Sequence, residues 1–562
     1  MLAGCLSRPL VEASPSTSNV FVDNAQQSGI DKIDLLFMVD NSTSMADKQE
    51  ILGNAVPVLV KRLTSPVCLD PDTGAPTGDS SKAGVCTHGK PEFVPVTDIH
   101  VGIITSSLSR HGGGGPACPD EQAHLLGTLR GAGSNPDPKL VFDAARTWNG
   151  SGFLAWDLNA QQKPPGVADP EAFEASFQDM IRASGEAGCG FEASLESWYR
   201  FLIDPEPPAN VTRDASTPPQ TVRNARLIKN ADGGSSCEGC DLDLLKQRAA
   251  FLRPDSLVAI VMLSDEDDCS IRDDGGGWHV ADTQPLPRAT SACDTNPNDP
   301  CCRSCGQIET TPPEGCTPLT AETSCQLKTV RSDDSQNLRC FAQQKRFGFD
   351  LLYPTSRYVD ALTKPTLTLQ SDGKTQVSNP LFAAPAGQAP RNPGSVYLAG
   401  IVGVPWQDIV DDASLSGPGL KYLSAKELET RGRWQTLLGD PSAQPPVPPS
   451  DPFMIPSVSA RSGENPITHD RIVPPSSVNP KASPINGHEQ NIPNQDDLQY
   501  ACTFTLATPR PCAAGASACD CSATRTGDFS AVTAANSPLC QPTGGGAPTA
   551  EQHFAKAYPG TR

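Results

Sequence analysis

The stretch that decides the fold is IDLLFMVDNSTS, residues 33–44. Its first seven residues are apolar except for Asp34, and the run ends in Asp40. A continuous apolar run of this length is typical of a strand covered on both faces, as in a parallel sheet. Apolar residues then recur at spacings of three and four from Ile51 to Leu63, which predicts a helix directly after the strand.

Similar apolar runs follow along the chain, at residues 99–105, 257–263 and 395–403. Segments with helical spacing lie between them, at residues 172–181, 191–202 and 241–252. Strands that alternate with helices predict an α/β fold, doubly wound and Rossmann-like, with a mostly parallel sheet flanked by helices. In such folds ligands bind beyond the carboxyl ends of the strands, and both Asp40 and Asp265 follow such an end.

The turn after the first strand carries oxygen donors in the pattern Asp40-x-Ser42-x-Ser44. Residues two apart in an extended turn can direct three oxygens toward one point. One carboxylate and two hydroxyls form a hard, oxygen-only shell suited to Mg²⁺, Mn²⁺ or Ca²⁺. Asp265, at the end of a later strand, can complete the shell through a water molecule. The alternative is that Asp40 and the two serines only cap the following helix, which is a common role for these residues.

These segments resemble the von Willebrand factor A domain and its metal-ion-dependent adhesion site. The resemblance is carried by three segments, LLFMVDNSTSM (35–45), IHVGIITSS (99–107) and VAIVMLSDEDD (258–268). It implies that Asp40, Ser42 and Ser44 are ligands from the first loop and that Asp265 is the distant aspartate. The GCGFE and SDEDDC segments are further similar to A-domain lipoproteins of bacteria such as myxobacteria.

The family also supplies a threonine ligand from a loop before a central helix, and Cys189 stands at that place in this chain. A thiol in a disulfide is a poor ligand for Mg²⁺, which requires oxygen. Ser184 and Glu192 are the nearby oxygen donors, and we select Glu192 as the replacement. The acidic residues 266–268 either bind a second cation or form a solvated face.

The chain opens with MLAGC, in which Leu2-Ala3-Gly4-Cys5 resembles the lipobox of bacterial lipoproteins. In that family the cysteine is lipidated and becomes the new N-terminus, so the resemblance implies lipidation at Cys5 and a tether over residues 1–30. Leu6 stands where an aspartate would retain a lipoprotein in the inner membrane, which points to the outer membrane. Because no signal region precedes the lipobox, and because the family's sheet has one more strand, we expect both termini to be truncated.

Charge and cysteine content restrict the function further. The 562 residues include 44 Lys+Arg and 64 Asp+Glu, a net charge of −20, which disfavours contacts with nucleic acid and with anionic lipid. Apolar runs stay short of the roughly 18 residues of a spanning helix, so we expect membrane contact only through a lipid anchor. The 20 cysteines indicate disulfides and an oxidising compartment. Zinc is the alternative, but the CEGC (237–240) and CCRSC (301–305) pairs lie too far apart for a zinc ribbon.

The predicted organisation has one α/β core with long additions. The core spans residues 31–435 and includes Cys-rich insertions at 66–98 and 269–340. Residues 436–498 are rich in proline and are interpreted as an insertion or linker. Residues 499–562 are interpreted as a Cys-rich segment with the start of a final helix at Ala557.

The expected function is protein binding at the cell envelope. A cation such as Mg²⁺ would bridge the site to an acidic residue of a protein partner, which a chain of charge −20 would otherwise repel. The alternative is a metal-independent, disulfide-stabilised scaffold. An enzyme is not expected, because His111-Gly-Gly-Gly resembles an esterase loop but no Gly-x-Ser-x-Gly, HExxH, Walker or dinucleotide motif accompanies it.

Overall fold

A computed structural model gives the fold of the chain. It describes residues 32–42, 44–82, 84–109, 111, 113, 121–129, 142, 144–211, 213, 224–229, 235–327, 334, 338–417, 419–458, 461–472, 498–512, 521, 539–543 and 549–559. The expected lipidation site, Cys5, and the expected tether lie outside these residues.

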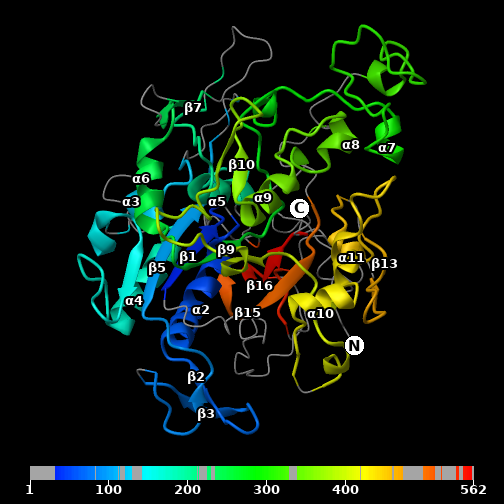
Figure 1. The fold of residues 1–562 in the computed structure, drawn as a ribbon. Coiled ribbons are helices and arrows are strands. Elements are labelled where there is room, and N and C mark those ends of the chain that lie inside the picture. Colours follow the sequence, from blue (N-terminus) through cyan, green and yellow to red (C-terminus); the bar gives the residue numbers. More distant parts are fainter. Residues whose placement is uncertain are drawn as a thin grey trace.

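A five-stranded sheet in the order β12-β9-β1-β5-β6 forms the centre of the molecule (Figure 1). Its strands are β1 (Lys32–Val39), β5 (Asp98–Thr105), β6 (Leu154–Asp157), β9 (Leu257–Leu263) and β12 (Val396–Ile401). Four of them run parallel, and only the edge strand β6 pairs antiparallel, with β5. The expected mostly parallel α/β sheet is therefore confirmed, and β6 is an additional strand that the sequence did not indicate.

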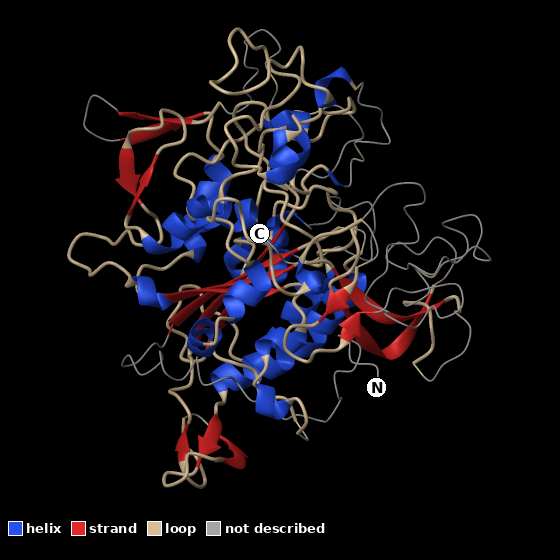
Figure 2. Cartoon of the chain, turned by 90° about the vertical axis from the view of Figure 1, so that its right-hand side faces the viewer, coloured by secondary structure: helices blue, strands red, loops and turns tan. Residues whose placement is uncertain are grey.

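Helices cover both faces of this sheet (Figure 2). On one face Leu35 and Phe37 of β1 share a core with α2 (Ala46–Thr64) and α4 (Pro170–Arg182). On the other face Leu36 and Met38 pack with the helices α5 (Ser194–Leu202), α6 (Leu242–Phe251) and α9 (Thr355–Thr363). Alternate residues of β1 thus enter two separate cores, which explains why the strand is apolar on both faces.

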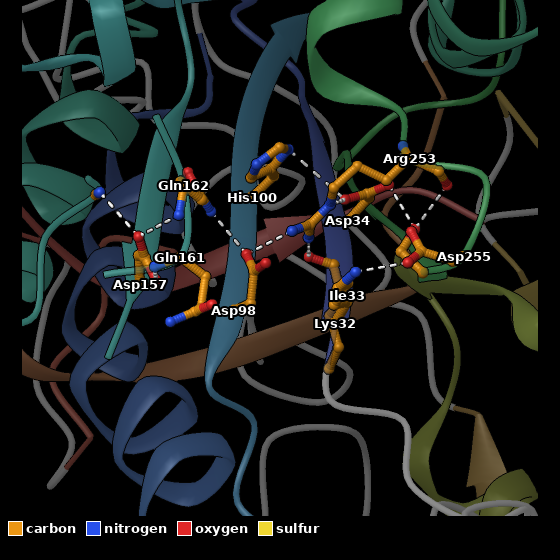
Figure 3. Close-up of polar contacts among 12 residues, drawn as sticks. Lys32, Ile33, Asp34, Asp98, His100, Asp157, Gln161, Gln162, Arg253 and Asp255 are labelled. Carbon is orange, nitrogen blue, oxygen red and sulfur yellow. Dashed lines mark hydrogen bonds and ion pairs between the residues drawn. The ribbon is translucent and has the colours of Figure 1, made fainter. Parts of the chain in front are cut away.

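Arg253 holds the amino ends of β1 and β5 together (Figure 3). Its backbone N–H and Nε donate hydrogen bonds of 2.7 and 2.8 Å to the carboxylate of Asp34, which is fully buried. Its other nitrogens donate to Asp98 and, over 2.9 Å, to the carbonyl of Ile33. Ser256 adds a hydroxyl donor to Asp34. This polar cluster lies at the end of the sheet opposite the predicted metal site.

Shorter elements make up the additions. The short helices are α3 (Leu126–Leu129), α7 (Ala292–Thr295), α8 (Gln343–Phe347), α10 (Ala425–Thr430) and α11 (Arg433–Leu438). The short strands are β2 (Val67–Leu69), β3 (Pro76–Ser80), β4 (Lys90–Pro91), β7 (Arg226–Lys229), β8 (Ser235–Glu238), β10 (Thr366–Thr368), β11 (Gln376–Ser378), β13 (Gly463–Glu464) and β14 (Arg471–Ile472). Within the described residues, no helix combines the length and the apolarity needed to cross a bilayer.

Disulfides hold many of these additions. The described pairs are Cys68–Cys86, Cys237–Cys240, Cys269–Cys340, Cys293–Cys302, Cys301–Cys316, Cys305–Cys325 and Cys521–Cys540. Both cysteine clusters that were candidates for zinc are thus disulfide-bonded. This disulfide content indicates an extracytoplasmic protein.

The chain ends in an antiparallel hairpin of β15 (Cys502–Pro511) and β16 (Glu551–Ala557). The final helix was expected to begin at Ala557, but that residue is the last of strand β16. The error has a physical cause, because the apolar residues of this segment, Phe554, Ala555 and Ala557, do not alternate with polar ones, and the strand's partner lies about forty residues earlier.

Candidate functional site

The first loop of the candidate site is built around Asp40. Because β1, β5 and β9 are parallel and in register, Asp40, Ser106 and Ser264 all follow the carboxyl ends of adjacent strands. Asp40 Oδ1 accepts hydrogen bonds from Ser42 N (2.8 Å) and Ser106 Oγ (3.3 Å), and its Oδ2 accepts from Ser264 Oγ (2.8 Å). The side chain is fully buried, so these three donors fix the orientation of its carboxylate.

Asp265 reaches the same loop from the end of β9. Ser44 Oγ donates to Asp265 Oδ2 over 2.8 Å, and the hydroxyls of Ser42 and Ser44 are 3.5 Å apart. Asp265 is only 1% exposed, whereas Ser44 is half-buried. Four of the five predicted ligands, Asp40, Ser42, Ser44 and Asp265, therefore lie together, and their role as metal ligands stays a prediction.

The fifth predicted ligand, Glu192, lies within electrostatic range of this cluster. Its side chain is buried, and burial raises the pKa of its carboxyl well above the usual value. The negative charges of Glu266, Asp40 and Asp265 raise that pKa further. Burial and these three negative charges therefore both favour the protonated form of Glu192.

The loop before α5 packs directly against the first loop. Gly188 N donates to the carbonyl of Asn41 over 2.7 Å, and Cys189 N donates to Ser107 Oγ over 2.9 Å. A Cβ on Gly188 would lie 2.4 Å from Asn41 Oδ1, so this close approach requires glycine. Cys189 is disulfide-bonded, as expected, and thus cannot replace the threonine of the resemblance as an oxygen donor.

Lys48 adds a cation that the sequence did not indicate. Its Nζ lies 2.8 Å from Asp265 Oδ2 and 3.0 Å from Asp47 Oδ1, and it donates to the carbonyl of Ser44 over 2.8 Å. Burial lowers the pKa of Lys48, but the charges of Asp265 and Asp47 outweigh burial and raise it overall. The helical spacing of four residues from Ser44 was the signal that could have located it.

The C-terminal hairpin supplies a second lysine. Gln552 Nε2 donates to Asp47 Oδ2 over 3.1 Å, and Tyr558 N donates to the carbonyl of Asp265 over 2.8 Å. Figure 1 shows this hairpin next to the central sheet. Between these contacts Lys556 is 1% exposed, and burial, followed by the charge of Lys48, lowers its pKa to about 7.

Replacing Lys556 with methionine should stabilise the protein at neutral pH. Since its folded pKa of about 7 lies below the unfolded value of about 10.4, the unfolded state binds more protons between these two pH values. Stability of the wild type should therefore rise with pH across this window, and the variant should lack the rise. Urea unfolding at about pH 7 and about pH 9 measures both effects. Lys426→Met, at an exposed lysine of α10, should keep the wild-type slope.

Carboxyl groups outnumber ammonium groups around the first loop. Two ammonium groups, Lys48 and Lys556, stand among a larger set of carboxyl groups, Asp40, Asp47, Glu192, Asp265 and Glu266. Burial, and then the charge of Asp265, raises the pKa of Asp40 to about 6. A divalent cation would offset this surplus, so the oxygen donors present fit Mg²⁺, Mn²⁺ or Ca²⁺.

Carboxylates alone do not make a metal site here. Among the described residues, no group of three or more His, Cys, Asp or Glu side chains is arranged to hold a metal ion. A cation at this place therefore depends on the serine hydroxyls and on water in addition to Asp40 and Asp265.

The fold and the disulfides define a class: an extracytoplasmic protein with a Rossmann-like α/β domain, whose strand ends carry an acidic, serine-rich site. No family model, curated protein or solved structure matches the chain.

Proposed function

We propose that this protein is a metal-dependent binding module of the von Willebrand factor A type. A divalent cation, Mg²⁺ or alternatively Mn²⁺ or Ca²⁺, is held by Asp40, Ser42, Ser44 and Asp265 and binds an acidic residue of a protein partner. The observation that carries this proposal is the convergence of these four oxygen-donor residues from two distant loops. A lipid on Cys5 would anchor the protein in the outer membrane.

Several serines orient the carboxylates of the proposed site. Ser106 and Ser264 orient the carboxylate of Asp40, and Ser44 orients that of Asp265. When bound, the cation supplies the positive charge that attracts a partner's carboxylate to a chain of net charge −20. Because Asp40 and Asp265 are buried, the partner approaches from the side of Ser44, which is half-buried.

Asp40→Ala should abolish cation binding and, with it, partner binding. Asp40 provides the only carboxylate from the first loop in the proposed ligand set, and its loss leaves hydroxyls that bind divalent cations weakly. Calorimetric titration with Mg²⁺, Mn²⁺ and Ca²⁺ measures the first effect, and capture of envelope proteins with and without chelator measures the second. Asp72→Ala, at an exposed aspartate near β3, should behave as the wild type.

The ion pair between Lys48 and Asp265 favours a second candidate function, a metal-independent scaffold, because the ammonium already neutralises this carboxylate. On that alternative the wild type releases no heat with any of the three cations, and partner capture is insensitive to chelator. Partner binding that survives both chelator and Asp40→Ala excludes the metal bridge.

A further inference from the structure

A disulfide outside the proposed cation site closes the CEGC segment of residues 237–240. Its two partners, Cys237 and Cys240, are three residues apart, whereas the other described disulfides join cysteines that are 9 to 71 residues apart. A cross-link that closes so short a loop removes little conformational freedom from the unfolded chain. This disulfide therefore contributes less to the stability of the fold than the longer-range disulfides do.

Backbone pairing holds both cysteines in place independently of the disulfide. Cys237 lies in β8, and every residue of β8 is paired with β7. Cys240 forms an antiparallel bridge with Pro208, and Asp241 N donates to the carbonyl of Pro207 over 2.8 Å. The Cα atoms of the two cysteines are 5.6 Å apart, which is within the range in which a disulfide forms. The disulfide can therefore open and close again while the backbone keeps its position.

The two cysteines differ in exposure. Cys240 is 7% exposed, whereas Cys237 is half-buried and lies between the exposed residues Ser236 and Glu238. Figure 1 shows β7, the partner strand of β8, at the edge of the molecule above α6. Thiol–disulfide exchange begins when a thiolate attacks one sulfur of the disulfide, so it depends on access to that sulfur. Cys237 is therefore the cysteine that an external thiolate attacks.

A polar cleft borders the two residues between the cysteines. Glu238 and Gly239 form part of the wall of this cleft, together with Arg226, Asp274 and Ser371, and its volume is about 620 Å³. The size falls within the range of about 300–1,000 Å³ that is usual for clefts that hold ligands. Charged and hydroxyl side chains along the wall suit the polar backbone of a peptide. The cleft can therefore hold a short stretch of a partner's chain next to the disulfide.

We propose that Cys237 and Cys240 form a redox-active disulfide that oxidises a dithiol of a partner protein. A thiolate of the partner attacks Cys237 Sγ, the bond between the two cysteines breaks, and Cys240 leaves as a thiolate that takes up a proton. The partner's second thiolate then attacks the partner's own sulfur in the mixed disulfide, and Cys237 leaves as a thiolate that is protonated in turn. Two electrons thus pass to this chain, which gains two thiols, while the partner gains one disulfide.

Equilibration of the full chain in glutathione redox buffers tests the proposal. Free thiols are alkylated, and peptide mass spectrometry measures the reduced fraction of each disulfide. Cys237–Cys240 should be half-reduced at a ratio [GSH]²/[GSSG] at least about tenfold lower than Cys68–Cys86, because redox pairs with Cys-x-x-Cys spacing have higher reduction potentials than structural disulfides. Cys68–Cys86 is the matched control, since it also joins a buried cysteine to a half-buried one but spans 18 residues. The circular dichroism should stay unchanged while only Cys237–Cys240 is open.

The variants of the two cysteines separate their roles. Cys240→Ser should form a mixed disulfide with glutathione at Cys237 at least about tenfold faster than Cys237→Ser forms one at Cys240, because exchange depends on access to the sulfur. A synthetic peptide with two cysteines is the probe for electron transfer. The wild type should oxidise this peptide, and the double variant Cys237→Ser/Cys240→Ser should leave it reduced.

Three results overturn the proposal. The first is a Cys237–Cys240 disulfide that resists glutathione as strongly as Cys68–Cys86 does, and the second is a peptide that stays reduced in the presence of the wild type. The third is a loss of the circular dichroism signal when Cys237–Cys240 opens, which makes the disulfide a structural one. All three are measured on the wild type, so they decide even where a variant fails to fold. They leave the proposed cation site unaffected, because the two sites share no residue.

Discussion

Replacing Arg253 with methionine should lower the free energy of unfolding by about 3–5 kcal/mol. The guanidinium and backbone of Arg253 satisfy the carboxylate of Asp34, which is fully buried between β1 and its neighbours (Figure 3). Methionine keeps the apolar stem but leaves that carboxylate without its charged partner. Removal of one partner of a buried ion pair costs far more than the pair itself contributes, because the remaining charge stays desolvated.

Urea unfolding followed by circular dichroism measures this loss. Arg226→Met is the matched control, since Arg226 pairs with Glu238 on the exposed hairpin of β7 and β8, where an ion pair contributes about 0–1 kcal/mol. The double variant Asp34→Asn/Arg253→Met should recover part of the loss, because it no longer buries a charge. Equal losses for Arg253→Met and Arg226→Met would contradict the assigned role.

The parallel strands could be predicted because each is apolar along its whole length. In β1 and β9 every second residue enters a different core, so the sequence shows an unbroken apolar run. Strand β6 gave no such signal, since it has four residues and pairs only at the edge of the sheet. The hairpin of β15 and β16 was also missed, because its pairing joins segments about forty residues apart and no local pattern records that pairing.

The same distinction applies to the site. Asp40, Ser42 and Ser44 could be located because they follow a recognisable strand, and Asp265 because it follows another. The two lysines were not predicted. The spacing from Ser44 could have placed Lys48 beside the first loop, but the contact of Lys48 with Asp265 and the whole placement of Lys556 depend on how α2 and β16 pack against the strand ends. The sequence therefore predicted the acidic side of the site and missed the cations that partly neutralise it.

Lys48→Met should tighten divalent-cation binding at the proposed site by about a hundredfold. The ammonium of Lys48 contacts Asp265 Oδ2 at 2.8 Å and so competes with a metal ion for this carboxylate. An ammonium and a divalent cation at the same carboxylate repel each other, and a repulsion of about 3 kcal/mol corresponds to about two powers of ten in affinity. Titration with Mn²⁺, followed by the paramagnetic resonance of the free ion, measures the change.

Lys61→Met provides the control. Lys61 is exposed on the same helix α2, and its replacement removes the same formal charge as Lys48→Met. It should change the affinity little, since exposed charges at longer range are screened by salt. If both variants tighten binding equally, the effect comes from net charge and not from competition at Asp265. If Lys48→Met weakens binding, the lysine supports the site by orienting Asp265 and Ser44, and the ammonium is then part of the cation site and not its competitor.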